Sequence, residues 1–301
     1  MAIPKGLEPT GVILVDKPAG PSSFAVLAGV RSRTRAKTGH AGTLDPFATG
    51  LLLLLSGRAT TMASCFVGLT KRYLTDVDLS RRTTTGDPEG QPLEEHEPLA
   101  AGGLEAALAN LRGEVELPIP TASAVKIGGE RAYDLHRRGV VVEMPLRRSR
   151  VDALDVIAYT NGIATLDLRV SSGTYVRSIA EALGGHCVTL RRTEVGPFSV
   201  DEADAEHVLA LEDALGRIGL TVAEAEAERR SRAERDRERD RDRNSDAASG
   251  SIPDSGSDSG PGRGAARPLD RRPPDGRPPD EDSPDERPPE TPSSGSEGVG
   301  R

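Results

Sequence analysis

The chain of 301 residues is long enough for two average domains, but its composition divides it unequally. All eight aromatic residues lie at or before position 198, and 11 of the 23 prolines lie from residue 253 onward. Residues 1–198 carry 23 basic against 21 acidic side chains, whereas residues 199–301 carry 16 against 26. The net charge of −8 therefore belongs to the C-terminal part, and it does not exclude a phosphate-binding surface on the rest.

Composition also excludes several classes of protein. Cys65 and Cys187 are too few for a disulfide framework or a cysteine-rich metal site, and both are expected to be buried thiols. The longest aliphatic run, Leu51 to Leu55, is far shorter than the ~18 residues of a membrane span. The first residues contain no apolar signal segment. We therefore expect a soluble, cytoplasmic protein.

The first part of the chain predicts strands interspersed with helices. Ser22 or Ser23 can cap a helix in which Phe24, Val26, Leu27 and Val30 share one face. Around this helix the pattern predicts a buried strand at 11–16, a Gly-rich loop at 38–50, a central strand at 51–55, a short helix at 59–66 and a half-buried strand at 73–79.

The second part predicts antiparallel pairing. Residues 83–98 are polar without periodicity and read as a loop, and Asn161-Gly162 is a strong hairpin signal between strands at 151–159 and 163–170. Helices are expected at 104–111, 129–138 and 178–183, and an extended segment at 188–192. The fold class is thus mixed α/β with antiparallel strands.

The C-terminal part divides at about residues 215 and 243. Fourteen of the 16 residues in 228–243 are charged with interleaved signs, which is typical of a solvated helix or a disordered run in 216–243. A basic arm for nucleic acid is the alternative, although the carboxylates cancel most of its field. Residues 244–301, rich in Pro, Asp, Ser and Gly, are expected to be a disordered tail.

The most informative segment is Gly39-His40-Ala41-Gly42-Thr43-Leu44-Asp45-Pro46-Phe47-Ala48-Thr49-Gly50, which precedes the leucine run. An isolated Asp in a loop usually only caps a turn. Here glycines and a proline fix the backbone around Asp45 at the mouth of a buried strand. Such rigid placement is what a nucleophile or general base requires.

This segment resembles the catalytic motif of the TruB family of pseudouridine synthases, which isomerise uridine 55 in the T loop of tRNA. The resemblance covers about residues 10–215. Further motifs follow in family order: GVILVDKPAGPSSF near the start, Lys71-Arg72-Tyr73, Ser123-Ala124-Val125-Lys126, Gly173-Thr174-Tyr175-Val176-Arg177-Ser178, and Leu190-Arg191-Arg192.

The resemblance implies a pseudouridine-synthase fold over residues 1–215, with a mixed, largely antiparallel sheet and an RNA-binding cleft. The reaction breaks the C1′–N1 bond of uridine, turns the base and joins C1′ to C5, so it requires no cofactor and no metal. The expected partner is the T arm of tRNA. We expect a monomer with no obligatory protein partner and no membrane contact.

The resemblance also assigns roles to residues. Asp45 is the expected nucleophile on a flipped-out uridine, whether it adds to C1′, adds to C6 or assists elimination to a glycal. Arg177 is its expected ion-pair partner, because a carboxylate in a dry pocket needs a cation to stay ionised. Tyr73 is expected to stack on the base and to act as a base toward the sugar. The remaining expected substrate-binding residues are Tyr175, Leu190, His40, which would prise the T loop apart, and Lys126.

Three features depart from the family pattern. Ala122 stands where a larger, often aromatic residue is common, which would thin one wall of the site. Only five residues separate Gly184 from Leu190, fewer than the resemblance implies, so the placement of Leu190 is in question. No alternating strands follow about residue 230, so the RNA-binding module of the PUA type, common at the C-terminus of the family, is not expected.

Two other functions fit the same motifs. The first is a tRNA-folding chaperone that opens the T loop without modifying it, which the retained Asp45, Tyr73 and Arg177 disfavour. The second is a pseudouridine synthase for another RNA. Modification of bare tRNA by the unassisted protein discriminates between these functions.

Overall fold

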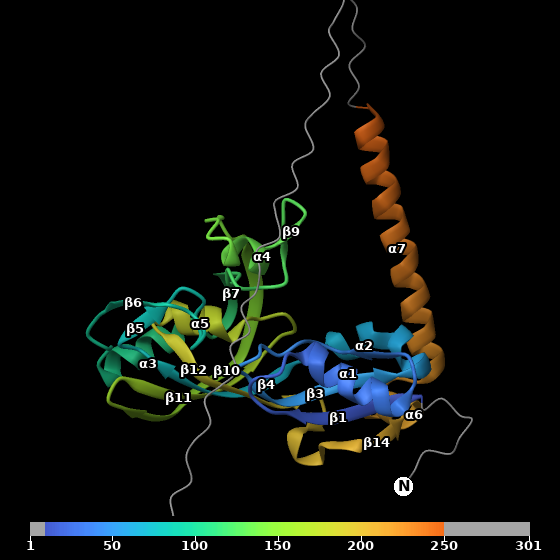
Figure 1. Ribbon diagram of the computed structural model, residues 1–301, viewed down its shortest axis with the longest axis horizontal. Coiled ribbons are helices and arrows are strands. Elements are labelled where there is room, and N and C mark those ends of the chain that lie inside the picture. Colours follow the sequence, from blue (N-terminus) through green and yellow to red (C-terminus); the bar gives the residue numbers. More distant parts are fainter. Residues whose placement is uncertain (1–9, 250–301) are drawn as a thin grey trace, which may run out of the picture. The chain divides into compact units, whose positions relative to one another are not determined.

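The structure is a computed structural model that describes residues 10–249. The helices are α1 (Ser23–Thr34), α2 (Ala63–Val67), α3 (Ala101–Ala109), α4 (Ala132–Arg137), α5 (Val176–Ala182), α6 (Leu211–Arg217) and α7 (Val222–Ser249), with 3-10 turns η1 (Gly57–Met62) and η2 (Val200–Glu202). The strands are β1 (Gly11–Lys17), β2 (Thr38–His40), β3 (Thr49–Ser56), β4 (Lys71–Asp78), β5 (Arg81–Thr83), β6 (Pro92–Glu95), β7 (Gly113–Pro118), β8 (Lys126–Ile127), β9 (Glu130–Arg131), β10 (Leu146–Thr160), β11 (Ile163–Val170), β12 (His186–Val195), β13 (Phe198–Ser199) and β14 (Asp204–Ala210) (Figure 1).

One ten-stranded sheet organises the described residues. Its strand order is β14-β1-β3-β12-β4-β11-β10-β7, with β2 paired to β3 and β13 paired to β12. Strands β3 and β12 run parallel, and every other described pair in this sheet is antiparallel. The prediction of a mixed, largely antiparallel sheet is confirmed.

The leucine run forms β3, a strand covered on both faces. Leu51, Leu53 and Leu55 pack with α2, α6 and the start of α7, whereas Leu52 and Leu54 pack against α1. Because side chains alternate across a strand, an unbroken apolar run is expected only where both faces are buried. The motif that contains Asp45 leads directly into the N-terminal end of this doubly covered strand, whose first residues are Thr49 and Gly50.

A second core lies under the other half of the sheet. Strands β4, β10, β11 and β12 contribute side chains such as Leu166 and Leu168, and α3 and α5 cover them with Leu104 and Ile179 (Figure 1). Strands β10 and β11 meet in a turn whose Asn161 and Gly162 have φ of 52° and 79°. Positive φ at both positions is what a two-residue hairpin of this handedness requires, so the predicted hairpin is confirmed.

Several predicted elements differ from the structure. Residues 83–98 were expected to be a loop, but β5 and β6 form a hairpin there, with Thr83 opposite Pro92. All side chains of β6 are exposed, so its pairing by backbone hydrogen bonds leaves no alternating pattern in the sequence. The expected loop at 38–50 begins with the three-residue strand β2, which is too short to show a period. Strands β7 and β14 and helix α6 were not predicted.

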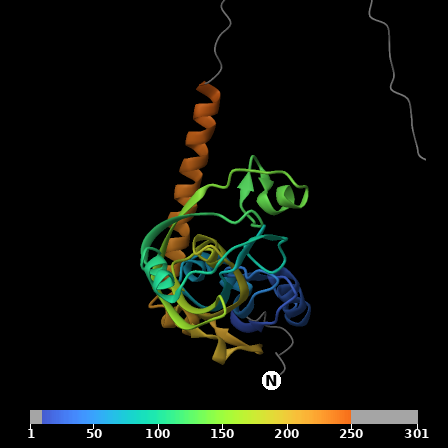
Figure 2. The ribbon, with the colours of Figure 1, turned by 90° about the vertical axis from the view of Figure 1, so that its left-hand side faces the viewer.

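The segment between β7 and β10 stands apart from the sheet. It contains the β8–β9 hairpin and α4, which lie together beyond the ends of β7 and β10 (Figures 1 and 2). The Ala132 and Tyr133 N–H groups donate to the Val125 and Ser123 carbonyls, which ties α4 to the preceding loop. Helix formation within 129–138 is thus confirmed over a shorter range.

Beyond α6, the charged segment forms helix α7, the helical one of the two expected states. Its first turns dock on the core through Val222 and Ala225, and Arg58 of η1 forms an ion pair with Glu226. The helix extends to Ser249, past the position where the disordered tail was expected to begin. The expected tail from residue 250 onward lies outside the described residues. No helix among the described residues is both long and apolar enough to cross a membrane.

Candidate active site

The segment that carries Asp45 connects β2 to β3 and is held in place by the start of α1. The Ser23 hydroxyl accepts a hydrogen bond from the Leu44 N–H and donates one to the Leu44 carbonyl, both at 2.8 Å. Where β3 begins, Gly50 has a φ of 101°, and a Cβ there would lie only 2.2 Å from the Arg192 carbonyl oxygen. Only glycine fits this close contact between the parallel strands β3 and β12, so Gly50 determines the position at which the loop ends and β3 begins its pairing.

Two buried cations hold the same segment through backbone carbonyls. The guanidinium of Arg192 on β12 is 1% exposed and donates to the carbonyls of Leu51, Thr43 and Gly42. The ammonium of Lys17, at the end of β1, donates to the carbonyls of Pro18, Pro21 and Pro46 at 2.8 to 3.1 Å. The backbone on both sides of Asp45 is therefore pinned by charge-assisted hydrogen bonds.

Arg177 lies between two carboxylates. Its Nε is 2.9 Å from Asp45 Oδ2, and its Nη1 is 3.0 Å from Asp87 Oδ2. The Arg177 and Asp87 side chains are 2% and 5% exposed, whereas 36% of the Asp45 side chain remains accessible. The Arg177 guanidinium thus contacts the buried Asp87 carboxylate on one side and the partly exposed Asp45 carboxylate on the other.

Backbone groups complete the environment of this charge cluster. Arg177 also donates to the carbonyls of Thr85 at 2.8 Å and Ala122 at 2.9 Å. Asp87 accepts from the Thr85 hydroxyl and from the Glu89 N–H. Ala122 therefore contributes through its carbonyl, and this contact does not depend on the size of its side chain.

The electrostatics of Asp45 balance burial against the neighbouring charges. Burial raises the pKa of the Asp45 carboxyl above its usual value, the Arg177 guanidinium opposes that rise, and the Asp87 carboxylate adds to it. A carboxylate with a raised pKa is a stronger base or nucleophile when it is ionised. The pairing with Arg177 keeps the ionised form accessible.

A cavity of about 190 Å³ opens beside Asp45. It is smaller than the ~300 Å³ or more of sites for drug-sized ligands, so it suits a single ring system. Asp45 and Arg177 contribute its charged wall and Tyr73 and Leu190 part of its apolar wall. The other lining residues include Lys71 and Tyr175 and the 171–174 turn.

Leu190 reaches the cavity despite the short connection before it. The chain leaves α5 through Gly184, with a φ of 85°, and Gly185, where a Cβ would lie 2.3 Å from the Asp78 carbonyl oxygen. These two glycines allow β12 to begin at His186 without a longer loop. The shortening therefore leaves Leu190 in the cavity wall, opposite Thr75 of β4.

Lys71, which precedes Tyr73 by two residues in its sequence motif, is a charged residue of the cavity wall. Its side chain is buried, and its ammonium contacts the Val67 and Leu69 carbonyls and the Ser172 hydroxyl. Burial and the nearby charge of Arg192 lower its pKa to about 8. Lys71 therefore joins the end of α2 to the 171–174 turn, two parts of the cavity rim.

Two of the predicted site residues lie outside the cavity wall. His40 is on β2, opposite Leu54, and its buried Nδ1 has no hydrogen-bond partner among the described residues. Burial and Arg192 lower the pKa of His40, so the ring is neutral at neutral pH. Lys126 is exposed on β8, opposite Arg131. The structure thus brings together Asp45, Arg177, Tyr73, Tyr175 and Leu190, and leaves His40 and Lys126 apart from them.

The sequence reasoning missed Asp87 and the structural use of Lys17, Lys71 and Arg192. Asp87 lies in the polar stretch that was expected to be a plain loop, and nothing in its local pattern distinguishes it. Among residues 10–249, no cluster of His, Cys, Asp and Glu has the arrangement of a metal site. The chemistry available here is that of a paired carboxylate next to an aromatic ring.

Comparisons with known proteins identify the family of this chain. A sequence profile of the TruB family pseudouridylate synthases, N-terminal domain, matches residues 31–176. The tRNA pseudouridine synthase B of Mycobacterium sp. (strain KMS) is 41% identical over 222 residues, which cover 68% of this chain and 73% of that protein. The enzyme of the same name from Xanthomonas campestris pv. campestris (strain B100) is 44% identical, over 64% of this chain and 65% of that protein.

A solved structure gives the same result for the fold. The crystal structure of a Cbf5-Nop10-Gar1 complex contains a chain that superposes with a TM-score of 0.51 at 27% identity, over 64% of this chain and 51% of that one. Together with the identity to the bacterial enzymes, this likeness confirms the predicted pseudouridine-synthase fold. The chain therefore belongs to the TruB family of pseudouridylate synthases.

Proposed function

We propose that this protein isomerises uridine to pseudouridine at position 55 in the T loop of tRNA, with Asp45 as the reacting carboxylate. The observation that carries the proposal is the position of Asp45, which is partly open to a one-ring cavity and paired at 2.9 Å with the buried Arg177. The names of the bacterial relatives support tRNA as the substrate. The membership of the TruB family supports the isomerisation.

The reaction needs only groups that this chain supplies. The C1′–N1 bond of the target uridine breaks, the detached uracil turns in the cavity, and C1′ bonds to C5. The proton on C5 leaves to solvent, and N1 gains a proton, so atoms and electrons balance without an oxidant or a second substrate. The ion pair at 2.9 Å between Arg177 and Asp45 would position the carboxylate for its attack or proton transfer.

The other predicted residues have positions that suit their proposed roles. The Tyr73 ring would stack on the flipped uracil, with its hydroxyl acting as a base toward the sugar, while Tyr175 and Leu190 limit the space in which the uracil turns. A neutral His40 outside the cavity suits insertion into the RNA stack vacated by the flipped nucleotide. The exposed Lys126 would contact phosphate rather than the base.

The proposed enzyme works alone. The groups to which the chemistry is assigned, Asp45, Arg177 and Tyr73, all come from this chain, and the proposed form is a monomer without an obligatory protein partner. The proposed substrate is the T arm of tRNA, and the proposed location of the reaction is the cytoplasm.

The test is the position of pseudouridine in a bare tRNA transcript. Purified protein is incubated with an unmodified transcript, and pseudouridine is mapped by carbodiimide chemistry, with a transcript carrying cytidine at position 55 as the matched control. The proposal predicts one modified position in the first transcript and none in the second. Binding without any product would instead support a chaperone, and modification elsewhere would support a synthase for another RNA site.

A further inference from the structure

The exposed face of helix α1 carries features that the active site does not use. From Lys17 to Leu44 the chain has five basic residues and no acidic one, and three of them, Arg31, Arg33 and Arg35, lie at the end of α1. At the start of the same helix, Phe24 was expected to share the buried face of Leu27 and Val30, but it lies about a quarter turn off that face and is 71% exposed. A large exposed aromatic ring on a cationic helix is typical of nucleic-acid contact.

Among the described residues, these three arginines have no carboxylate partner, a property they share with other arginines such as Arg82 and Arg147. On the sheet, by contrast, Arg72 and Arg191 each bind a carboxylate with two nitrogens. The positive field at the end of α1 is therefore left for a partner that brings its own negative charge.

Arg35 adds a conformational signal. It caps the C-terminus of α1 with a φ of 53° and a ψ of 15°, the left-handed region in which helices usually place glycine. A non-glycine residue there is strained, and such outliers are concentrated where function requires a particular side chain. The exposed side chain of Arg35 therefore occupies a position whose backbone conformation favours glycine.

Helical spacing gathers three of these residues on one face. Phe24 and Arg31 are seven residues apart and so lie on one face of α1, and Arg35, the C-cap residue four positions after Arg31, ends a stripe about 16 Å long on the 1.5 Å rise of a helix. Arg33 is more than half a turn away from Arg31. The stripe begins next to Ser23, whose hydroxyl binds Leu44, the neighbour of Asp45. One end of the stripe is therefore fixed to the catalytic loop.

We propose that the stripe of Phe24, Arg31 and Arg35 binds the tRNA strand that flanks the flipped nucleotide, with Phe24 stacking on an unpaired base and the two arginines on consecutive phosphates. The inference rests on the proposed function, because it takes tRNA as the substrate. The stripe is a binding surface for RNA backbone outside the cavity. It contributes to affinity and leaves the chemical step unchanged.

The test compares affinities for an unmodified tRNA transcript over a series of KCl concentrations. The double variant R31Q/R35Q is expected to bind about tenfold more weakly, and its slope of log affinity against log salt should be shallower by about 1.5, since each phosphate contact contributes roughly 0.7 to 0.9. Phe24→Ala should weaken binding by about tenfold with the slope unchanged. At saturating tRNA, the rate of pseudouridine formation should equal that of the wild type in both variants.

Arg33→Gln is the matched control, since it removes one positive charge from another side of the same helix. It should leave the affinity and the slope nearly unchanged. A slope reduced as much per charge by Arg33→Gln as by the double variant would overturn the proposal, because net charge alone would then account for binding. A Phe24→Ala variant with wild-type affinity would overturn the stacking contact. Failure of the proposed function would appear separately, as wild-type protein that binds the transcript and forms no pseudouridine.

Discussion

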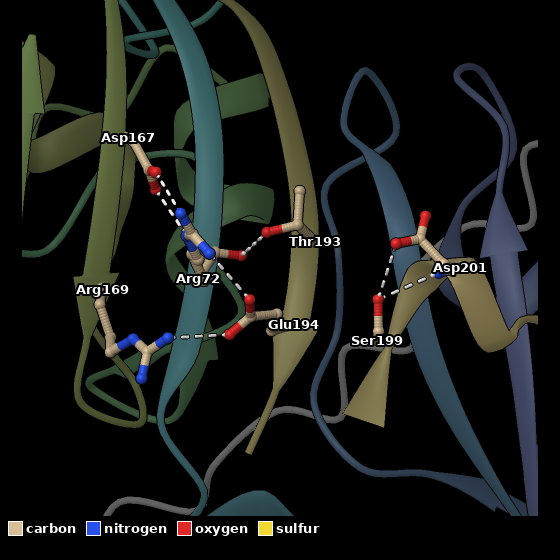
Figure 3. Close-up of polar contacts among 7 residues, drawn as sticks. All are labelled: Arg72, Asp167, Arg169, Thr193, Glu194, Ser199 and Asp201. Atoms are coloured by element: carbon tan, nitrogen blue, oxygen red, sulfur yellow. Dashed lines mark hydrogen bonds and ion pairs between the residues drawn. The ribbon is translucent and has the colours of Figure 1, made fainter. Parts of the chain in front are cut away.

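Two arginine–carboxylate networks lie on opposite faces of the same sheet. On the cavity face, Arg177 is buried between Asp45 and Asp87. On the outer face, Arg72 binds Asp167 and Glu194, and Glu194 also binds Arg169 (Figure 3). Arg72 is next to Tyr73 of the cavity wall, so the alternation of a strand separates the two networks.

The difference between the networks is their exposure. Arg72 and Arg169 are 41% and 49% exposed, where water screens their attraction for the carboxylates, and exposed pairs contribute only about 0 to 1 kcal/mol each. Arg177 has lost nearly all contact with water, which is costly and is tolerated only when every partner is present. The comparison indicates that the ion pairs of the outer face hold strands together, whereas the buried one prepares a reactive carboxylate.

Among the variants that test the difference between the buried and the exposed network, Arg177→Met should cause the largest loss of stability and activity. It leaves Asp87 buried without a cation, so the free energy of unfolding should fall by about 3–5 kcal/mol, and the rate of pseudouridine formation should fall by about 10³-fold. Urea unfolding and single-turnover assays measure the two losses. If the variant fails to fold, Arg177→Lys keeps the charge without the two-sided geometry, and a wild-type rate in that variant would contradict the account.

Asp87→Asn removes the negative charge behind Arg177 and keeps the size of the side chain; its one amide oxygen can keep the contacts to Thr85 and Glu89 while the acceptor that faces Arg177 is lost. The rate is expected to fall by about 10²-fold, since Arg177 loses one of its two fixed partners. Because the Asp87 charge raises the pKa of Asp45, its removal should move the acidic limb of the pH–rate profile to lower pH. A purely structural role for Asp87 would lower the rate and leave that limb in place.

The buried Lys71 in the cavity wall should make the stability of the protein depend on pH. Its pKa is lowered to about 8, below the value near 10.5 of an unfolded chain, so the unfolded state binds more protons between these pH values. The cost of burying Lys71 is fully present below pH 8 and is relieved as the pH rises from 8 toward 10.5. The stability of the wild type relative to Lys71→Met should therefore improve over that range in urea unfolding, and a constant difference would contradict the lowered pKa.

Arg72→Met should give the smallest effect. The exposed network loses its centre, but the free energy of unfolding is expected to change by less than about 1 kcal/mol and the rate not at all. Raising the salt concentration should reduce even this difference. A loss of activity comparable to that of Arg177→Met would erase the distinction between the two faces.

The helices and strands that the sequence predicted correctly are those whose formation depends on a pattern within a few neighbouring residues. The unbroken run Leu51 to Leu55 required burial on both faces, and Asn161-Gly162 required a tight hairpin, so both were predictable. Strands β6 and β7 bury almost no side chain and are defined by backbone pairing with distant segments, which leaves no trace in a single sequence. Helix α6 is only seven residues long and is stabilised mainly by packing on β1 and β14.

The candidate site was predictable where a motif holds it and not where the fold assembles it. Asp45 stood out because glycines and a proline surround it, and the resemblance linked it to Arg177, which follows 132 residues later in the sequence. Asp87 had no such context, because its importance comes from the guanidinium that the fold places beside it. A guanidinium has five N–H donors, and pairing with Asp45 alone would leave several of the Arg177 donors unused. This surplus was the sign in the sequence that a second acceptor, found to be Asp87, was needed.

The release of the C5 hydrogen tests the central claim most directly. A tRNA transcript made with uridine tritiated at C5 loses tritium to water each time C1′ becomes bonded to C5, so single-turnover tritium release reports the isomerisation itself. The account predicts release by the wild type and a loss of at least about 10³-fold in Asp45→Asn, with tRNA affinity retained. Release by Asp45→Asn at a rate close to that of the wild type would contradict the assignment of Asp45 as the reacting carboxylate.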